Sequence, residues 1–166
     1  EYYRGVIFSE GYQVLSNPYF QDIPIEPTKG EVIIARKEGP QSDTILKHHC
    51  FIIPWEDDLY WIGSNYEKFP EDDQIDMKNL EDLELRLQRS VIDQFEIVER
   101  WTGIRPASKD RRPVIGEHPT QKGLYIFNGL GTKGTVYAPY FANQLVDHLL
   151  SGILIHEEVS VNRWLL

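Results

Sequence analysis

The sequence predicts an α+β fold, and three observations lead to this prediction. Short runs of β-branched and aromatic residues recur between turns, as at residues 30–35, which is typical of strands. Residues 80–95 carry apolar side chains at spacings of three and four, which is typical of an amphipathic helix. A glycine-rich turn at 129–134 precedes a second helical stretch, and Gly152 follows the expected end of that helix.

The predicted strands are short apolar runs bounded by turn residues. They fall at residues 5–8, 30–35, 44–53, 59–64, 97–104 and 124–127. Pro18, Pro24 and Pro27 predict an irregular connection between the first two strands, because proline has no N–H for a strand ladder.

The helix limits are predicted from capping residues and from a proline. Asn79 is the expected N-cap of the first helix, and its first turn is acidic, as the positive end of a helix favours. The apolar stripe of this helix consists of Leu80, Leu83, Leu87, Val91 and Phe95. The second helix is expected to begin near Val136, because Pro139 is tolerated only in a first helical turn.

Length and composition narrow the class of protein. The chain has 166 residues, enough for one domain or slightly more, and its 41% hydrophobic and 26% charged residues are ordinary for globular proteins. Disordered, collagen-like and coiled-coil proteins are therefore poor matches. No apolar run approaches the ~20 residues of a membrane span, and no signal peptide opens the chain. Since the chain starts at Glu1, directly before a strand, we expect a piece of a longer polypeptide.

The cysteine content and the charge indicate a compartment and a kind of partner. Cys50 is the single cysteine, which excludes an intramolecular disulfide and favours a reducing, cytoplasmic location. A net charge of −9 argues against nucleic-acid binding. Residues 56–84 hold eleven acidic residues and two lysines, whereas residues 100–134 hold seven basic and two acidic residues. The basic segment is suited to one small anionic ligand.

Residues 129–134 match the dinucleotide-binding pattern G-x-G-x-x-G, between a predicted strand and a helix. The glycines let backbone N–H groups approach an anion, which the helix dipole also favours. A complete dinucleotide-binding domain does not fit, because only 32 residues follow Gly134 and leucines occupy the place of the expected acidic residue. An ordinary glycine turn before a helix is the alternative.

Arg105 ends a predicted strand between Gly103 and Pro106, two residues that restrict the backbone and would aim the guanidinium. Arginine offers a planar pair of donors to a carboxylate or a phosphate. A surface salt bridge is the competing interpretation.

Other candidate sites have weaker support. His48 and Cys50 share one face of a predicted strand, but two ligands do not make a zinc site, so core packing of Cys50 is expected. The acidic residues 71–73 are expected to form a solvated loop rather than a cation site. No metal is therefore expected. The chain has no serine-hydrolase, Walker or zinc-protease motif, so hydrolase and phosphoryl-transfer activities lose their usual support.

Residues 101–116 carry a specific resemblance. Their sequence, WTGIRPASKDRRPVIG, resembles the W-x-G-x-R-P-x-x-x-D-x-x-P-x-I-G segment of the FAD-dependent D-amino-acid oxidase family, which includes glycine, sarcosine and D-amino-acid oxidases. Residues 123–139 are similar to the closing flavin loop and helix of that family. Weaker similarities precede them in the family's order, at residues 5–11, 27–31 and 51–67.

This resemblance implies a fold and a division of the chain. It implies the mixed or antiparallel sheet of the oxidase substrate-binding domain with a long helix, plus the C-terminal strand–loop–helix of the FAD domain. Residues 1–27 would be a strand and connector of the FAD domain, 28–102 the substrate-binding domain, and 103–166 the return to the FAD domain. The family's N-terminal G-x-G-x-x-G has no counterpart, so the implied partner is a missing N-terminal FAD-binding part.

The resemblance also implies a reaction, in which a small amino acid or secondary amine is oxidised by hydride transfer to the flavin. Arg105 would bind the substrate carboxylate, with Tyr66 and Lys133 as further substrate-binding residues. Lys133 stands where many amine oxidases of the family carry Arg or His, so the substrate stays open. No general acid or base is required of this chain. A dehydrogenase remains an alternative to an oxidase.

The implied cofactor is non-covalent FAD, held only in the intact protein, because Cys50 is not at the position of the flavin-linked cysteine of sarcosine oxidases. Amides near Val136 would face the flavin and stabilise its reduced, negative form. The cofactor-binding residues would be Gly11, Gly129, Gly131, Thr132, Lys133, Gly134 and Thr135. The alternative function is a stand-alone acidic interaction module without catalysis, supported by the charge of residues 56–84.

Overall fold

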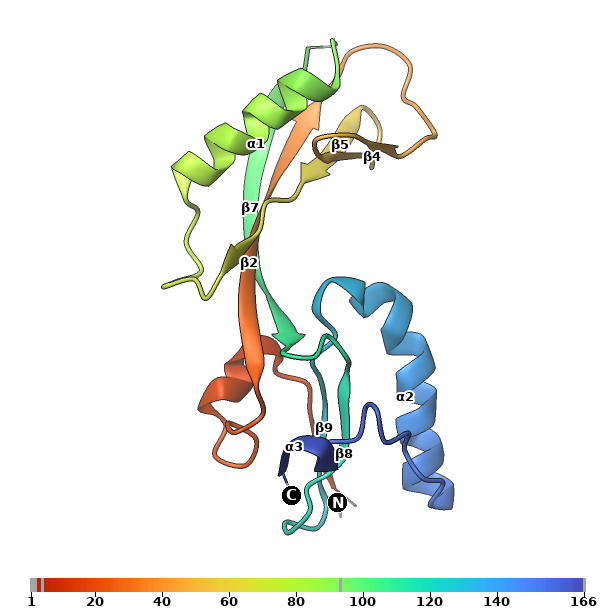
Figure 1. The fold of residues 1–166 in the computed structure, drawn as a ribbon. Helices are drawn as coiled ribbons and strands as arrows, with labels where there is room; N and C mark the ends of the chain where they lie inside the picture. The colour runs from red at the N-terminus through yellow and green to blue at the C-terminus, as the bar shows by residue number, and fades with distance from the viewer. Residues whose placement is uncertain (1–2, 4, 93, 166) are drawn as a thin grey trace. The chain divides into compact units, whose positions relative to one another are not determined.

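A computed structural model describes residues 3, 5–92 and 94–165, and its chain forms two compact units. Unit 1 comprises Glu1–Pro27 and Arg105–Leu166, and unit 2 comprises Thr28–Ile104 (Figure 1). Unit 1 is therefore assembled from two segments of the chain, between which unit 2 is inserted. The α+β class is confirmed, since antiparallel sheet and one long helix account for most of the regular structure.

Unit 2 is built on a six-stranded sheet in which β2 is the central strand. The strand order is β3-β4-β5-β2-β6, and β7 also pairs with β2. The strands are β2 (Ile25–Arg36), β3 (Leu46–Lys47), β4 (Phe51–Pro54), β5 (Leu59–Gly63), β6 (Glu67–Lys68) and β7 (Glu96–Ser108). β2 pairs antiparallel with β5 and with β6. The strand predicted at 30–35 is the second half of β2. The irregular connection predicted to reach Pro27 ends earlier, because β2 begins at Ile25 and includes Pro27.

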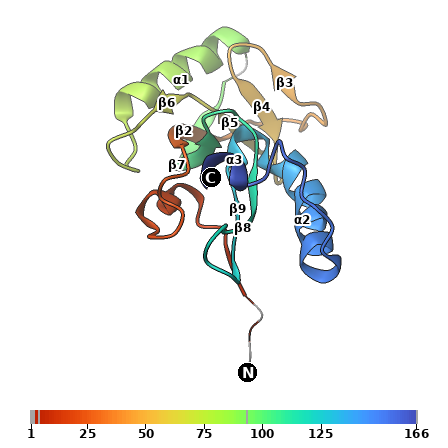
Figure 2. The same cartoon turned by 60° about the horizontal axis from the view of Figure 1, so that its bottom comes forward.

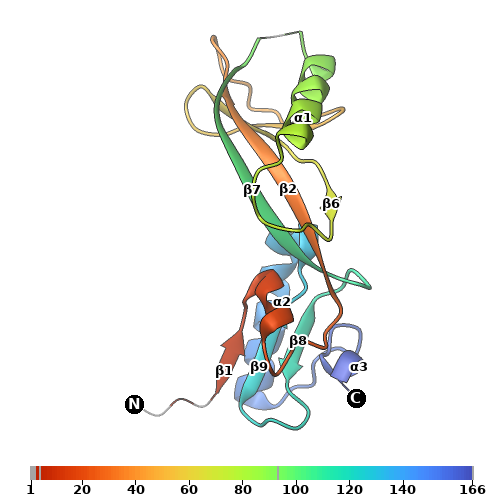
Figure 3. The ribbon, with the colours of Figure 1, turned by 90° about the vertical axis from the view of Figure 1, so that its left-hand side faces the viewer.

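One face of this sheet is covered by α1 (Met77–Ser90), which lies beside β2 and β7 (Figure 3). Leu80, Leu83 and Leu87 are buried, as the predicted stripe requires. The last two predicted members are not in the helix, because α1 ends at Ser90; Val91 is its C-cap, and Phe95 lies in the connection to β7. The three leucines pack against Ile33, Ala35, Cys50, Ile52, Tyr60 and Ile62 of the sheet side. Burial of this stripe is what holds α1 to the sheet, since each buried leucine is worth roughly 1.5–3 kcal/mol.

The predicted N-cap of α1 is wrong by three residues. Asp76 caps the helix, and its side chain accepts the backbone N–H of Lys78 at 2.8 Å. Asn79 instead donates from Nδ2 to Glu67 Oε2 at 3.1 Å. Both residue types cap helices well, and here the bond to Glu67 engages the asparagine.

The single strand predicted at 44–53 is two strands, β3 and β4, paired antiparallel with Leu46 opposite Ile52. His48 donates its backbone N–H to the Cys50 carbonyl at 3.0 Å, which closes the turn between them. His48 and Cys50 therefore do not share a strand face. Cys50 is buried in the core, as expected, and burial raises the pKa of its thiol, an effect that the Ser90 hydroxyl partly offsets.

Unit 1 contains a three-stranded sheet of order β1-β9-β8. β1 (Val6–Phe8) is parallel to β9 (Leu124–Asn128) (Figure 3). β8 (Val114–Glu117) is antiparallel to β9 and lies beside it (Figure 2). A 3-10 helix, η1 (Gly11–Ser16), follows β1, and a short helix, α3 (Asn162–Leu165), lies near the end of the chain. The core of the unit consists of Val14, Phe20, Ile23, Ile25, Val114, Ile126 and Val161.

The long helix of unit 1, α2 (Gly134–Ser151), begins two residues earlier than predicted. A 3-10 turn, η2 (Gly131–Lys133), leads into it, and Pro139 lies in the second helical turn. Proline at that position leaves one carbonyl of the preceding turn without its helical N–H. The C-terminus is as predicted, since Gly152 adopts a left-handed conformation with φ of 68°.

Candidate functional site

The end of β7 that carries Arg105 belongs to unit 1 and lies against the glycine loop at 129–134. Ala107 and Leu130 form an antiparallel bridge. A Cβ placed on Gly131 would lie 3.5 Å from both Cα and Cβ of Ala107. Arg105 is two residues before Ala107 on the same strand and is half-buried. The structure thus brings the strand of the predicted substrate arginine to the predicted flavin loop.

Asn128 connects the two glycine turns of the predicted cofactor site. Its side chain is 3% exposed and donates from Nδ2 to the Gly11 carbonyl at 2.8 Å. Its Oδ1 accepts the backbone N–H of Gly129 at 2.8 Å. Gly11 and Gly129 are therefore held next to each other although 118 positions separate them in the sequence. The sequence analysis missed Asn128, and the signal was a polar residue directly between an apolar strand and a glycine.

The glycines of the site have different structural requirements. Gly11, Gly129 and Gly131 have φ angles of +63°, +73° and +54°, which glycine adopts without steric cost. A Cβ at Gly129 would also lie 3.2 Å from Val114 N and 3.4 Å from Arg112 O. Nothing lies within 4 Å of a Cβ placed on Gly11. Gly129 is thus required by the fold of unit 1, whereas the space over Gly11 is open.

The start of α2 presents polar groups to its surroundings. Thr132, Lys133 and Thr135 are exposed around the first helical residues. Lys133 occupies the N-cap without a side-chain capping bond, and its Nζ lies 5.7 Å from the centre of the Tyr137 ring. The first N–H groups of a helix have no intrahelical acceptor, and the helix dipole is positive there. This end of α2 is suited to a group that carries or develops negative charge.

These features fit the ring of a flavin. Open space over Gly11, the N-terminal end of a long helix and a nearby ammonium group are what a planar, hydrogen-bonding ring that becomes anionic requires. The residues of the described chain that would hold it are Gly11, Gly131, Thr132, Lys133, Gly134 and Thr135, while Gly129 shapes the turn.

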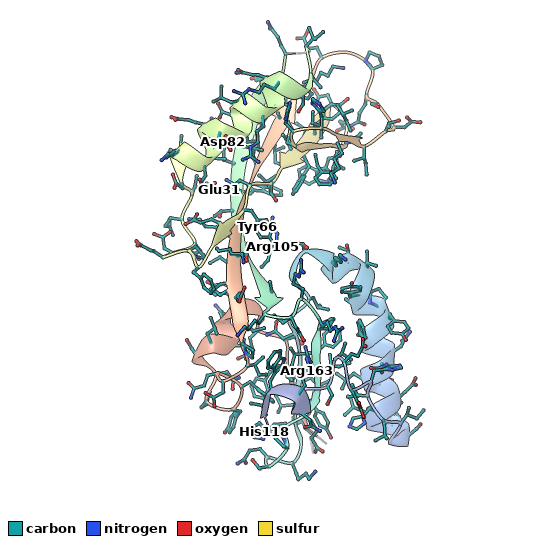
Figure 4. The ribbon with its side chains drawn as sticks, in the orientation of Figure 1. Glu31, Tyr66, Asp82, Arg105, His118 and Arg163 are labelled. Atoms are coloured by element: carbon teal, nitrogen blue, oxygen red, sulfur yellow. The ribbon has the colours of Figure 1, made fainter. Side chains whose placement is uncertain are left out.

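Tyr66, the third predicted substrate residue, lies in unit 2 directly before β6 and is 57% exposed. Figure 4 labels Tyr66 and also Glu31, which lies on β2. Its neighbour Asn65 is buried and bonded to Glu31, which is itself fully buried. Lys29, which is also buried, and Glu31 belong to the segment 27–31 that resembles the family, but neither was predicted from the sequence to have a role in the site.

The other candidate sites gain no support. Among the residues that the structure describes, no group of three His, Cys, Asp or Glu side chains could hold a metal ion. Residues 71–73 are exposed, as expected of a solvated loop. No helix within the described ranges has the length and hydropathy that a bilayer span needs.

Comparison with known proteins identifies relatives. The sequence profile of the DAO family, FAD-dependent oxidoreductases, matches residues 1–148. Glycine oxidase of Geobacillus kaustophilus is 31% identical over 142 residues, which cover 83% of this chain and 35% of that protein. Glycine oxidase of Pseudomonas putida is 30% identical over 137 residues, which cover 79% of this chain and 36% of that protein.

Solved structures agree with the sequence comparison. The crystal structure of the Geobacillus kaustophilus glycine oxidase superimposes with a TM-score of 0.78 at 26% identity, covering 92% of this chain and 42% of that one. Iminodiacetate oxidase from Chelativorans shares the fold, with a TM-score of 0.83 at 20% identity over 96% of this chain and 46% of that one. The chain spans about two fifths of the length of these relatives. It belongs to the DAO family of FAD-dependent oxidoreductases.

Proposed function

We propose that the intact protein carrying this chain oxidises a small amino acid or secondary amine by hydride transfer to FAD. The observation that carries the proposal is the Ala107–Leu130 bridge, which brings the strand end bearing Arg105 to the glycine loop at the start of α2. Arg105, which would bind a carboxylate, and the N-terminal end of α2, which would stabilise an anion, then both belong to unit 1. The relatives named glycine oxidase and iminodiacetate oxidase support an amino-acid or amine substrate.

In this proposal each residue has a defined role. Bound FAD supplies the electron acceptor for the hydride that leaves the α-carbon of the substrate. Arg105 binds the substrate carboxylate and orients that carbon, while Tyr66 and Lys133 contribute further substrate contacts. The amides at the start of α2 stabilise negative charge on the reduced cofactor. Residues 28–102 would form the substrate-binding domain, and residues 1–27 and 103–166 would belong to the FAD domain.

Non-covalent binding of FAD is supported by the environment of Cys50. The thiol is buried in the core of unit 2, and burial raises its pKa, which disfavours the nucleophilic thiolate. The remaining cofactor contacts would come from an N-terminal FAD-binding part, and a cytoplasmic location suits the single free cysteine.

The acidic segment 56–84 does not require a protein partner. At least six of its carboxylates already have partners within unit 2, and Asp58, Asp82 and Glu84 pair with arginines. Glu67 and Asp72 lie 3.2 Å and 3.8 Å from Lys29 Nζ, and Asp76 caps α1. Part of the negative charge that supported an interaction module is therefore paired within unit 2. The family match favours the enzyme over that alternative.

The test is reduction of the bound flavin under anaerobic conditions. The FAD-loaded intact protein is mixed with glycine, sarcosine or D-alanine, and the visible absorbance of the flavin is followed. Loss of this absorbance with at least one of them supports the proposal. Rapid return of the absorbance when oxygen is admitted indicates an oxidase, whereas return only with another acceptor indicates a dehydrogenase. A flavin that none of a panel of amino acids and secondary amines reduces would contradict the proposal.

A further inference from the structure

The segment between β5 and α1, residues 64–76, is attached to the middle of β2 by two buried ionisable residues. Lys29 is 4% exposed and Glu31 is fully buried. Both point to this segment rather than to solvent, and Tyr66 lies within it (Figure 4). Buried charged groups are costly unless their hydrogen bonds are satisfied, so their partners define what they hold in place.

Glu31 uses its backbone and both carboxylate oxygens to bind the two ends of the segment. Its backbone N–H donates to Asn65 Oδ1 at 2.7 Å. Asn65 Nδ2 donates in return to Glu31 Oε2, and the backbone N–H of Asp76 donates to Glu31 Oε1. The reciprocal pair with Asn65 fixes the first end of the segment, and the bond from Asp76 fixes the last residue before α1.

Lys29 holds the middle of the same segment. Its Nζ donates to the Gln74 carbonyl at 3.1 Å and lies 3.2 Å from Glu67 Oε2. Lys29 and Glu67 are also opposite each other in the antiparallel pairing of β2 with β6. Burial alone lowers the pKa of the Lys29 ammonium, but its bond to Glu67 and the nearby carboxylates raise the pKa overall.

Tyr66 lies between two residues that are both turned toward β2. Asn65 bonds Glu31, and Glu67 bonds Lys29. Tyr66 stands directly before β6 and is 57% exposed, so it is not buried with the Lys29 and Glu31 side chains. The backbone on each side of this exposed phenol is thus fixed by a buried, hydrogen-bonded ionisable group.

We propose that Glu31 and Asn65 are positioning residues that preset the orientation of Tyr66 for substrate binding. This inference rests on the proposed function, in which Tyr66 contacts the substrate. A phenol whose backbone is fixed before binding loses less conformational entropy when its hydroxyl meets a ligand. The carboxylate of Glu31 is specifically suited to this task, because both of its oxygens accept N–H donors. A glutamine at position 31 would place its own NH₂ donor opposite one of these N–H donors, so that hydrogen bond would be lost.

The experiment is a double-mutant cycle in the intact, FAD-loaded protein. We compare Glu31→Gln, Tyr66→Phe and the double variant with the wild type, and we measure kcat and KM for the amino acid that reduces the flavin fastest. Glu31→Gln should raise KM about tenfold, the loss of one hydrogen bond of about 1.4 kcal/mol, with little change in kcat. The double variant should have the KM of Tyr66→Phe alone, because the effect passes through Tyr66.

Two further variants separate positioning from general damage. Glu71→Gln removes an exposed carboxylate from the same segment and should leave KM unchanged. Asn65→Ser shortens the partner of Glu31 and should raise KM in the same direction, so the proposal stays testable if Glu31→Gln folds poorly. FAD content and thermal unfolding identify a variant that has lost its fold.

The outcomes distinguish this inference from the proposed function. If no amine or amino acid reduces the wild-type flavin, the role of Tyr66 and the positioning proposal both fall. If the wild type is active but Glu31→Gln and Asn65→Ser leave KM unchanged, the positioning proposal alone is wrong. The same holds if the effects of Glu31→Gln and Tyr66→Phe on KM multiply in the double variant.

Discussion

Arg163 and Asp110 form a two-pronged ion pair that joins α3 to the turn after β7. The guanidinium donates from Nε to Asp110 Oδ2 at 3.0 Å and from Nη2 to Oδ1 at 3.3 Å. It also donates to the backbone carbonyls of Ser160, Arg112 and Pro113. The two side chains are only 16% and 26% exposed. The acidic residue of the motif at 101–116 thus has a structural partner near the end of the chain.

Asp110→Asn should lower the free energy of unfolding by about 1–3 kcal/mol, between the values of exposed and fully buried ion pairs. The physical reason is that Arg163 keeps its buried guanidinium but loses the opposing charge. Urea unfolding measures the change. Asp147→Asn, at an exposed position of α2, serves as the matched control and should change the stability by less than about 0.5 kcal/mol. Equal stability of both variants would contradict a stabilising ion pair.

The same pair predicts a dependence of stability on pH. Burial raises the pKa of the Asp110 carboxyl, but its bonds to Arg163, Arg112 and Ser108 outweigh burial and lower the pKa overall. A carboxyl with a lowered folded pKa stabilises the protein above its unfolded pKa of about 3.9, and this contribution is lost as the pH falls through the folded value.

The difference in unfolding free energy between the wild type and Asp110→Asn should therefore be constant above about pH 5 and shrink below about pH 4. The check is to measure the urea unfolding of both proteins at a series of pH values from about 6 to about 2. A difference that stays the same down to the lowest pH would show that the charge of Asp110 is not what stabilises the fold.

Three glycine-to-alanine variants should separate fold from cofactor binding. Gly129→Ala combines a positive φ with a close approach to Val114 N, so we expect a loss of about 2–3 kcal/mol. Gly11→Ala has a positive φ but open space, so we expect only about 1 kcal/mol of stability loss, together with weaker FAD retention in the intact protein. Gly103→Ala, with open space and no positive φ, should change neither quantity.

Chemical denaturation and the ratio of flavin to protein absorbance measure these two effects. If Gly11→Ala retained FAD as well as Gly103→Ala does, the open space over Gly11 would not be part of the cofactor site.

The sequence predicted the periodic parts of the fold better than its junctions. The apolar stripe of α1 is set by spacing alone, and Leu80, Leu83 and Leu87 are buried as predicted. The turn at His48 was missed, because an apolar and β-branched run does not reveal where a chain reverses. The N-cap of α1, Asp76, and the first residue of α2, Gly134, both differ from the prediction. For α1 the reason is a tertiary hydrogen bond, from Asn79 to Glu67, which engages the competing cap residue.

The residues of the candidate site were likewise predicted where they form local sequence patterns and missed where they do not. The motif at 101–116 and the glycine loop were visible as local patterns, and the Ala107–Leu130 bridge brings them together. Asn128, Lys29 and Glu31 stand in segments that resemble the family, but no role was predicted for them, because their hydrogen bonds join residues far apart in the sequence. Single-sequence patterns do not contain such pairings.

The isolated 166-residue chain should not retain FAD. It spans about two fifths of its relatives, and the residues that would contact the cofactor are limited to the glycine turns and the start of α2. Purification of this chain should give a colourless protein, whereas the intact protein should be yellow. A stoichiometric amount of flavin on the isolated chain would show that it contains a complete cofactor site.

The most direct test of the proposed amino-acid oxidation is Arg105→Met in the intact, FAD-loaded protein. Removal of one partner of a buried charge pair costs roughly 2–5 kcal/mol, so kcat/KM for an amino acid should fall by about 30- to 5,000-fold. Arg105→Lys should recover only part of this loss, because an ammonium cannot form the two-pronged bond. FAD content should stay normal, and Arg112→Met, at an exposed arginine of the same segment, serves as the control.

The decisive measurement compares this amino acid with its decarboxylated amine in the wild type and in Arg105→Met. If Arg105 binds the carboxylate, the variant should lose activity toward the amino acid and retain the weaker activity of the wild type toward the amine. Equal slowing of both substrates would contradict the account, because Arg105 would then support the fold and not the substrate.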